Sequence, residues 1–550
     1  MRHLPHFTAI VLSACLLAAC SSGSNNTSTA VAPQSSGGAE AGTPHYGGTL
    51  KIGSTSSADT LLSIYANVEG SQNDLSLAYD PLLNVNPQMQ VVPWLAEKYE
   101  LSNGGKTYTM HLRHNAMWSD GQPITSADAV FEYQLEIDPA TQAPYKSDFD
   151  EVASVTAPDK WTVVYTLKAP DAAFLANVIA GVVHAPLPVH IYGKIPHASM
   201  RHLDISKNFV GSGPYIVTDW KTDDHMTLTS NKTWWKGRPF IDEIYIKEYQ
   251  DEQAQLIALQ NGEVDMPYLL TSPQWLTLKD DSRFTHIHTY SNNFDWWVPN
   301  LTDPLMSDVN IRRAMMYAWD RQTEADKLFH KEDIPVFSPF SLAQWAVSPA
   351  ARTAYPYDPA KAGQILDADG WKMGPDGYRS KNGQQLALTV DIISGNAVGA
   401  KDFEFVQANL KSVGIKASAK QSEINVFYQN EASGKFEVGV GGEQLSTDPE
   451  PSQILGCKFF PPGGLNYARY CNPKMDALLA EGKIEADQAK RKAIYSQVQD
   501  LAIQDVPYLW SVSPYYRNVV NTRIKGVDPA QAGPSFIYTM YNVSKWWVAQ

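Results

Sequence analysis

The sequence predicts an α/β protein with more than one lobe. Its 550 residues are enough for two to four domains of ordinary size. Segments in which apolar residues alternate, as in half-buried strands, are interspersed with segments in which they recur every three or four residues, as in amphipathic helices. The chain shows no internal repeat, so a solenoid is not expected.

The first half of the chain contains predicted strands and one well-marked helix. Residues 50–53 and 215–218 read as short strands, and Tyr108, Met110 and Leu112 alternate on one face of a longer one. Residues 161–167 alternate in the same way, so both longer segments are predicted to be half-buried antiparallel strands. Between them, Thr125 and Asp128 have the spacing of a capping box, which predicts a helix to about residue 137.

Helices become more frequent in the second half. Residues 252–260 have helical spacing, and Gly262 is placed to end that helix in a left-handed conformation. Asp308 is expected to cap a helix over residues 309–321. Further helices are predicted at residues 359–368, 402–413, 473–481 and 488–503, and further strands at 386–393, 415–421, 435–440 and 516–520.

The N-terminus reads as an export signal. Arg2 precedes an apolar run over residues 7–17, which is too short for a membrane helix but typical of a signal peptide. The run ends in Leu-Ala-Ala followed by Cys20, which resembles a bacterial lipobox, with residues 1–19 removed and Cys20 acylated. The alternative is an ordinary cleavage site with an incidental cysteine. Residues 20–45 are rich in Ser, Gly and Thr and predict a flexible tether.

The charge balance of the chain argues against one class of protein. The chain carries 44 Lys and Arg against 58 Asp and Glu, a formal net charge of −14. This balance argues against sequence-independent nucleic-acid binding, which requires a basic face.

Of the four cysteines, Cys15 lies in the signal and Cys20 in the lipobox. Cys457 and Cys471 remain as an even pair in an exported chain, which predicts a disulfide.

Several segments, in this order, resemble the extracellular solute-binding proteins of family 5, the peptide-binding components of ABC importers. The resemblance extends from about residue 47 to about residue 527, and the most distinctive block is WSDGQPITSADAV at residues 118–130. The other blocks are residues 94–97, 106–113, 211–215, 234–237, 308–314, 318–321, 357–362 and 448–449.

The resemblance implies a two-lobed fold of the periplasmic-binding-protein type, with an extra subdomain in the N-terminal lobe. Lobe one is then expected at residues 46–292, with the subdomain at about 81–210. Lobe two is expected at 293–512, and residues 513–550 return to lobe one. Such a fold closes by a hinge around a ligand, and a membrane partner recognises the closed state.

The resemblance also implies ligand contacts at the end of a lobe-two strand, at Gly442, Glu443, Gln444, Leu445 and Ser446. Peptide binders of the family commonly place an acid three residues before an Asp-Pro pair, where it meets the α-ammonium group of the ligand. Leu445 occupies that position here, so Glu443 is the candidate replacement. The alternative is that Glu443 is a strand-end acid facing water, while Asp448 is expected to form a structural turn.

Aromatic and polar side chains supply further candidates. Trp296 and Trp297 follow a predicted lobe crossing, and because adjacent strand residues face opposite sides, at most one is expected to line the cleft. Trp345 lies in a loop rich in Ser and Pro and is a weaker candidate, and core packing is expected to explain most of the 15 tryptophans. Ser54, Thr55 and Ser56 form a polar loop that either offers hydrogen bonds to a ligand or is simply a turn.

The sequence predicts no cofactor, no metal site and no catalysis. His286 and His288 are expected on one face of a strand, but the histidines at residues 184–202 lack the spacing of a ligand template, and scattered imidazoles are usually solvated or packed in a core. No nucleophile elbow, zinc-protease or phosphate-loop motif is present. We therefore expect a monomeric lipoprotein, anchored outside the cytoplasm, that delivers a short peptide to an ABC permease. The alternatives are an oligosaccharide or metal-chelate binder on the same scaffold and, as a different class, a secreted hydrolase.

Overall fold

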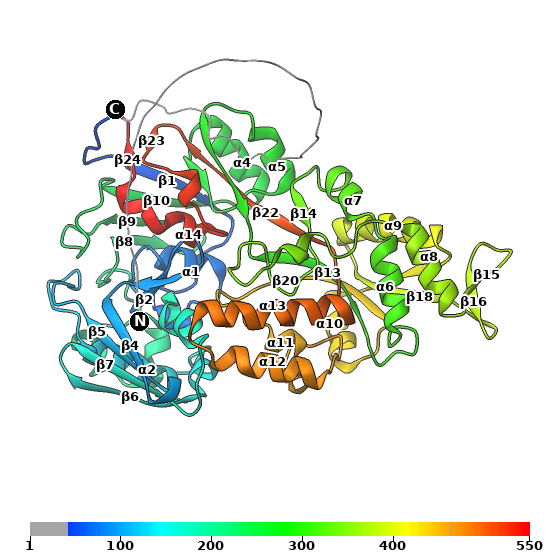
Figure 1. The fold of residues 1–550 in the computed structure, drawn as a ribbon. Helices are drawn as coiled ribbons and strands as arrows, with labels where there is room; N and C mark the ends of the chain where they lie inside the picture. The colour runs from blue at the N-terminus through cyan, green and yellow to red at the C-terminus, as the bar shows by residue number, and fades with distance from the viewer. Residues whose placement is uncertain (1–41, 463, 550) are drawn as a thin grey trace, which may run out of the picture. The chain divides into compact units, whose positions relative to one another are not determined.

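The computed structural model describes residues 42–462 and 464–549 (Figure 1). The described residues from 43 onward form one compact unit. The predicted signal peptide at residues 1–19, the lipidation site Cys20 and nearly all of the predicted tether at 20–45 lie outside the described residues. Among the helices of the described part, none has both the length and the apolar character needed to span a bilayer.

The first of two five-stranded sheets is formed by the early part of the chain. Its order is β11 (Met266–Pro267), β1 (Thr49–Ser54), β10 (Glu243–Glu248), β9 (His225–Ser230) and β8 (Tyr215–Lys221). β1 is parallel to β10 and β11, and the remaining pairs are antiparallel. Helix α4 (Glu252–Asn261) lies in the chain between β10 and β11, and α5 (Ser272–Leu278) follows β11. Gly262 ends α4 with a φ of 76°, which confirms the predicted left-handed cap.

A four-stranded antiparallel sheet is inserted after β1. Its order is β4 (Ala96–Ser102), β5 (Thr107–Leu112), β7 (Thr162–Leu167) and β6 (Val152–Asp159). Tyr108, Met110 and Leu112 are buried, as their alternation predicts. Helix α2 (Ser126–Ile137) contacts β6 and β7 and starts at the predicted capping box of Thr125 and Asp128.

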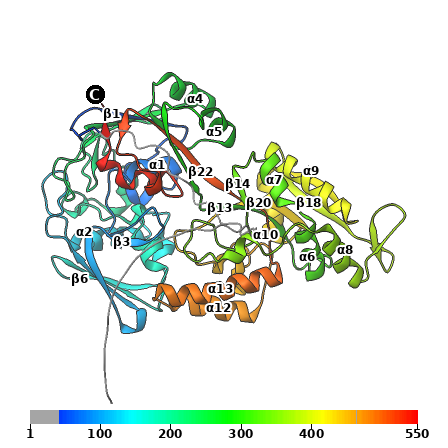
Figure 2. The same ribbon diagram turned by 45° about the horizontal axis from the view of Figure 1, so that its top comes forward.

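The second five-stranded sheet lies in the middle of the chain. Its order is β19 (Lys416–Ser422), β18 (Ala387–Ile393), β20 (Val438–Gln444), β13 (Asn293–Pro299) and β21 (Leu509–Trp510). One hydrophobic core on this sheet includes α6 (Val309–Ala318), α8 (Pro359–Ala368) and α9 (Ala397–Ser412). Another includes α12 (Pro473–Ile484) and α13 (Gln488–Asp505), which lie side by side in Figures 1 and 2.

One predicted helix is interrupted. Residues 309–321 were expected to be continuous, but α6 ends at Ala318 and α7 (Arg321–Lys327) begins separately. Trp319 has an extended backbone, and the Asp320 side chain accepts a hydrogen bond from the Thr323 amide. An aspartate that satisfies a free amide starts a new helix at this point.

Two long strands connect the two sheets. β12 (Phe284–Tyr290) pairs with β22 (Val512–Asn521), which also pairs with β14 (Asp333–Pro335). The chain thus passes from β12 into β13 at Ser291 and Asn292, and returns from β21 into β22 at Ser511. Figure 2 shows β22 and β14 between the part of the unit with β1 and α4 and the part with α6, α8 and α9. The exact lobe boundaries stay a prediction.

The remaining elements are short or peripheral. A disulfide joins Cys457 to Cys471, next to α12. The other helices are α1 (Glu69–Leu75), α3 (Val189–Tyr192), α10 (Ile424–Ser433), α11 (Ser452–Leu455) and α14 (Phe536–Thr539). The other strands are β2 (Leu83–Val85), β3 (Val91–Pro93), β15 (Lys372–Met373), β16 (Arg379–Lys381), β17 (Gln384–Gln385), β23 (Ile524–Lys525) and β24 (Trp547–Val548).

Candidate ligand-binding site

A cavity of about 1380 Å³ lies beside the point where the chain crosses into β13. Its wall combines residues from the part of the chain that contains the first sheet with residues from the part that contains the second sheet. The charged or titratable side chains on this wall are Glu69, Asp80, His330, Asp333, Asp295, Lys401 and Arg517. The aromatic ones include Tyr145, Tyr268, Tyr515, Phe536 and Tyr538.

The register between β13 and β20 determines which side chains face this cavity. In an antiparallel pair, residues directly opposite each other project to the same face. Asp295 is opposite Gly442, and Phe294 is opposite Glu443. Asp295 lines the cavity, whereas Phe294 belongs to the buried core that contains α12 and α13. Glu443 therefore projects to the face opposite that of Asp295.

Asp295 is a half-buried carboxylate of the cavity wall without a hydrogen-bond or ion-pair partner among the described residues, whereas the unpaired Glu69 is exposed. Within residues 42–462 and 464–549, no side chain or backbone amide donates a hydrogen bond to it. Burial, together with the neighbouring carboxylates of Asp333 and Asp402, raises its pKa to about 8. A Cβ atom at residue 442 would lie 2.6 Å from Asp295 Oδ1, so glycine at this position leaves room for the carboxylate.

Two other acids in the wall have partners of their own. Asp333 lies 3.5 Å from the Arg517 guanidinium, and burial raises its pKa to about 6 although Arg517 opposes this. Asp80 accepts hydrogen bonds from the indole N–H groups of Trp94, Trp234 and Trp235 at 2.6–2.8 Å. These two carboxylates are held by the protein itself, which distinguishes them from Asp295.

The loop after β20 forms part of the wall and is tightly held. Leu445 and Ser446 both line the cavity, and Gln444 is the last residue of β20, opposite Asn293. The Leu445 amide donates to the Asn292 carbonyl at 3.0 Å, and the Asn292 side chain donates to the carbonyls of Leu445 and Ser446. The crossing residue Asn292 thus fixes this loop against β13.

Glu443 does not line the cavity. Its carboxylate is half-buried, and burial raises its pKa to about 7. It lies close enough to Tyr467 and Tyr508 to raise their pKa values by its charge. This position gives no support to the expectation that Glu443 replaces the acid missing at Leu445, whereas Asp295 on the paired strand does line the cavity.

Two of the three candidate tryptophans, Trp296 and Trp297, are buried in the protein, and Trp345 is half-buried. Trp296 stacks on Tyr508 with ring centroids 4.2 Å apart, and Trp297 donates its indole N–H to Asp402 at 2.8 Å. They belong to different hydrophobic cores, as opposite strand faces predict, and neither is part of the cavity wall. Trp345 packs against Tyr495, also away from the cavity.

The polar loop at the end of β1 is a turn. The Ser54 hydroxyl donates to the Ser56 carbonyl at 2.8 Å and accepts from the Ser56 amide at 3.0 Å. Ser56 Oγ accepts from the Gly70 amide, and Thr55 is exposed. None of the three lines the cavity, so this geometry matches the turn alternative.

Sequence reasoning missed most of the cavity wall. Asp295 lies within the segment recognised as a crossing, but nothing in its neighbours distinguishes it from an ordinary strand residue. Tyr268 and Tyr538 come from segments far apart in the chain, which only the fold brings together. The one sequence signal that bears on Asp295 is the alternation of β13, which places Asp295 on the same strand face as Trp297 and opposite to Trp296.

Three comparisons with known proteins agree with this fold. Residues 90–460 match the model of the bacterial extracellular solute-binding proteins, family 5. The oligopeptide-binding protein AppA of Bacillus subtilis is 25% identical over 99% of this chain and 98% of its own. Its structure in complex with a nonapeptide has a TM-score of 0.70, covering 92% of this chain and 100% of that one. NikZ of Campylobacter jejuni in complex with Ni(L-His), 22% identical, has a TM-score of 0.71 over 91% and 99% of the two chains.

The family model covers about two thirds of the chain, and both structures share its mixed α/β arrangement over nearly its whole length. The family is one of binding proteins rather than enzymes. The chain is therefore a bacterial extracellular solute-binding protein of family 5, and it binds a solute without transforming it.

Proposed function

We propose that this protein captures a short peptide and delivers it to the permease of an ABC import system. The similarity to an oligopeptide-binding protein over the whole chain supports this assignment. The cavity of about 1380 Å³ exceeds the roughly 300–1,000 Å³ typical of sites for drug-sized molecules. Its aromatic side chains suit the apolar side chains of a peptide.

The observation that carries the proposal is the unpaired carboxylate of Asp295. A charge that is largely removed from water needs a partner of opposite sign, and among the described residues no cationic side chain, including Lys401 and Arg517 of the wall, forms an ion pair with Asp295. The α-ammonium group of a peptide would be that partner. Asp295 on β13 therefore pairs with the α-ammonium group, a role for which Glu443 on the neighbouring strand β20 was the candidate from sequence.

Contacts across the cavity would hold it closed around the ligand. Thr447 Oγ1 lies 2.9 Å from the Tyr538 hydroxyl, and the Asp448 amide donates to Asn177 Oδ1 at 3.2 Å. Thr447 and Asp448 follow β20, whereas Asn177 and Tyr538 belong to the other side of the crossing strands. We propose that these pairs form when lobes at residues 46–292 with 513–550, and at 293–512, close by a hinge.

The N-terminal residues complete the proposal. A signal peptide at residues 1–19 would direct export, acylated Cys20 would anchor the chain to the membrane, and the tether at 20–45 would hold the binding unit away from it. A position outside the cytoplasm agrees with membership of an extracellular solute-binding family. It also agrees with the Cys457–Cys471 disulfide.

We expect the affinity for trialanine to rise between pH 6 and pH 7.5. The pKa of Asp295 is raised to about 8 by burial, so the carboxyl must lose a proton before it can pair with an ammonium group. Each pH unit below that pKa weakens binding by up to about tenfold, while the peptide ammonium stays protonated up to about pH 7.7. Isothermal titration calorimetry across this range measures the effect.

N-acetyl-trialanine is the control ligand, because it lacks the ammonium group. Its affinity should change little over the same pH range. A flat or falling profile for trialanine would show that Asp295 does not receive the amino terminus.

A further inference from the structure

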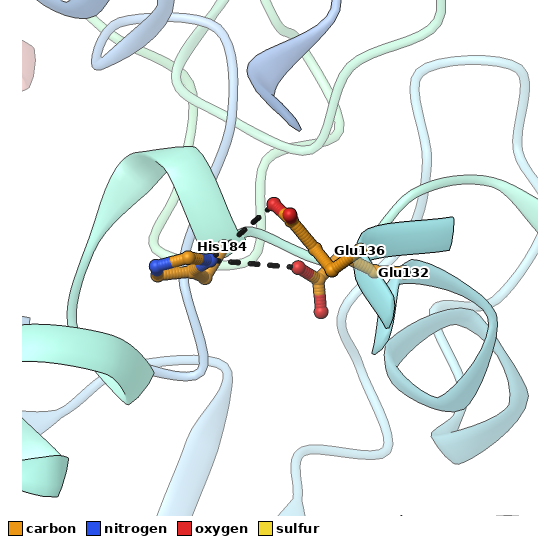
Figure 3. Close-up of side chains that lie close together, drawn as sticks. All are labelled: Glu132, Glu136 and His184. Carbon is orange, nitrogen blue, oxygen red and sulfur yellow. Dashed lines mark ion pairs between the residues drawn. The ribbon is translucent and has the colours of Figure 1, made fainter. Parts of the chain in front are cut away.

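Three buried side chains of the inserted subdomain meet away from the ligand cavity. Glu132 and Glu136 lie one turn apart on α2, so both carboxylates share a helix face. His184 ends a short helical turn, Val182–His184, and its Nδ1 points toward both carboxylates (Figure 3). Nδ1 lies 3.7 Å from Glu132 Oε1 and 3.6 Å from Glu136 Oε1, and each of the three side chains is at most 2% exposed.

The polar atoms that face the centre of this cluster lack hydrogen-bond partners. Glu132 Oε1, both carboxylate oxygens of Glu136 and His184 Nδ1 have no hydrogen-bond partner in the described part of the chain. Buried polar atoms are almost always paired, and an unpaired carboxylate is especially costly. Two carboxylates and one imidazole nitrogen at this spacing form a donor set that can hold a cation.

The opposite side of the imidazole is held by another acid. His184 Nε2 lies 3.2 Å from Asp148 Oδ2, so its N–H can donate to that carboxylate and leave the Nδ1 lone pair free. A carboxylate behind a histidine in this way fixes the tautomer that binds a metal. Phe149 and Tyr145 pack edge-on against the ring at centroid distances of 5.0 and 5.8 Å, which fixes its orientation.

We propose that Glu132, Glu136 and His184 bind a divalent transition-metal cation, with zinc as the ion that suits this donor set. Zinc accepts imidazole nitrogen at about 2.0 Å and carboxylate oxygen at about 2.0–2.2 Å. Tetrahedral bonds of that length separate the donor atoms by about 3.3–3.6 Å, close to the spacings found here. Three protein ligands leave the fourth position to water.

The cation would be structural rather than transported. None of the three donors lines the ligand cavity, but Val182 and Val183, next to His184, do. A metal ion at this position would fasten the Val182–His184 turn to α2 and so stiffen one wall of the cavity. Histidine spacing alone does not predict the site, because its two carboxylates come from a distant helix.

Zinc binding to the tag-free, metal-stripped chain tests this proposal, by calorimetry and by metal content after gel filtration. We expect about one zinc ion per chain and a melting temperature that rises with zinc concentration. Glu132→Gln and His184→Asn should each weaken zinc binding at least about a hundredfold. The matched control is His197→Asn, since His197 lies in the same subdomain and pairs at the surface with Asp138.

Both site variants are first checked for folding by circular dichroism without metal. Because Glu132→Gln removes a buried charge, its metal-free melting temperature should not fall below that of the wild type. Zinc binding that persists in the site variants, or a wild-type chain that retains no zinc, would overturn the proposal. Trialanine binding is not a readout here, so the result is independent of the proposed function.

Discussion

Asp295→Asn is expected to reduce the affinity for trialanine by about a hundredfold or more, because removing one member of a buried charge pair costs about 2–5 kcal/mol. The substitution keeps the size of the side chain and removes only the charge that would meet the peptide ammonium. Affinity for N-acetyl-trialanine should change by less than about threefold, since that ligand makes no such pair. Isothermal titration calorimetry at pH 7.5 measures both affinities.

Glu443→Gln is the matched control. Glu443 is the other acid of this strand pair, but the register places it on the opposite face, so both ligands should bind as they do to the wild type. An equal loss of both ligands in Asp295→Asn would refute the charge pairing. A selective loss of trialanine in Glu443→Gln would return the role to Glu443.

The ligand-free Asp295→Asn protein should be no less stable than the wild type at pH 8. An acid whose pKa is raised in the folded state makes the protein less stable as pH rises from its ordinary pKa to the raised value of about 8. Asparagine does not ionise, so the variant does not lose stability in this way as the pH rises. Reduced affinity therefore cannot be explained by unfolding.

Arg491→Met is expected to lower the free energy of unfolding by about 3–5 kcal/mol, because it leaves a buried carboxylate unpaired. Arg491 on α13 makes a two-fold ion pair with Asp448, at 2.5 and 2.6 Å, and both side chains are at most 6% exposed. It also donates to the Gly482 carbonyl at the end of α12. Urea unfolding followed by circular dichroism measures the loss.

The double variant Asp448→Asn with Arg491→Met provides the control. It removes both charges, so it should recover a measurable part of the stability lost in Arg491→Met alone. A double variant that is less stable than Arg491→Met would show that packing, and not the unpaired charge, causes the loss. Because residues 445–447 precede Asp448 and line the cavity, the single variant should also weaken ligand binding.

Local signals in the sequence predicted the elements well. The Pro359–Ala368 helix has the expected bounds. Alternation predicted that Trp296 and Trp297 face opposite sides of their strand, and they pack into different cores. The break between α6 and α7 was missed because Asp320 acts as a cap only once Trp319 is extended. Helix caps of this kind depend on packing that periodicity does not reveal.

The cavity was harder to predict, because its composition depends on register. A family pattern pointed to the end of β20, and Leu445 and Ser446 do line the cavity. Glu443 and Asp295 differ only in the face to which each projects, and a shift of one residue in the pairing would exchange them. The Glu132, Glu136 and His184 cluster likewise forms only when α2 packs beside the Val182–His184 turn.

Native mass spectrometry of the protein as purified tests most directly whether the cavity holds a peptide. We expect part of the population to carry extra mass that collisional activation releases as short peptides with free amino termini. Asp295→Asn should carry markedly less of this mass. Release of an oligosaccharide or a metal chelate in place of peptides would contradict the peptide assignment.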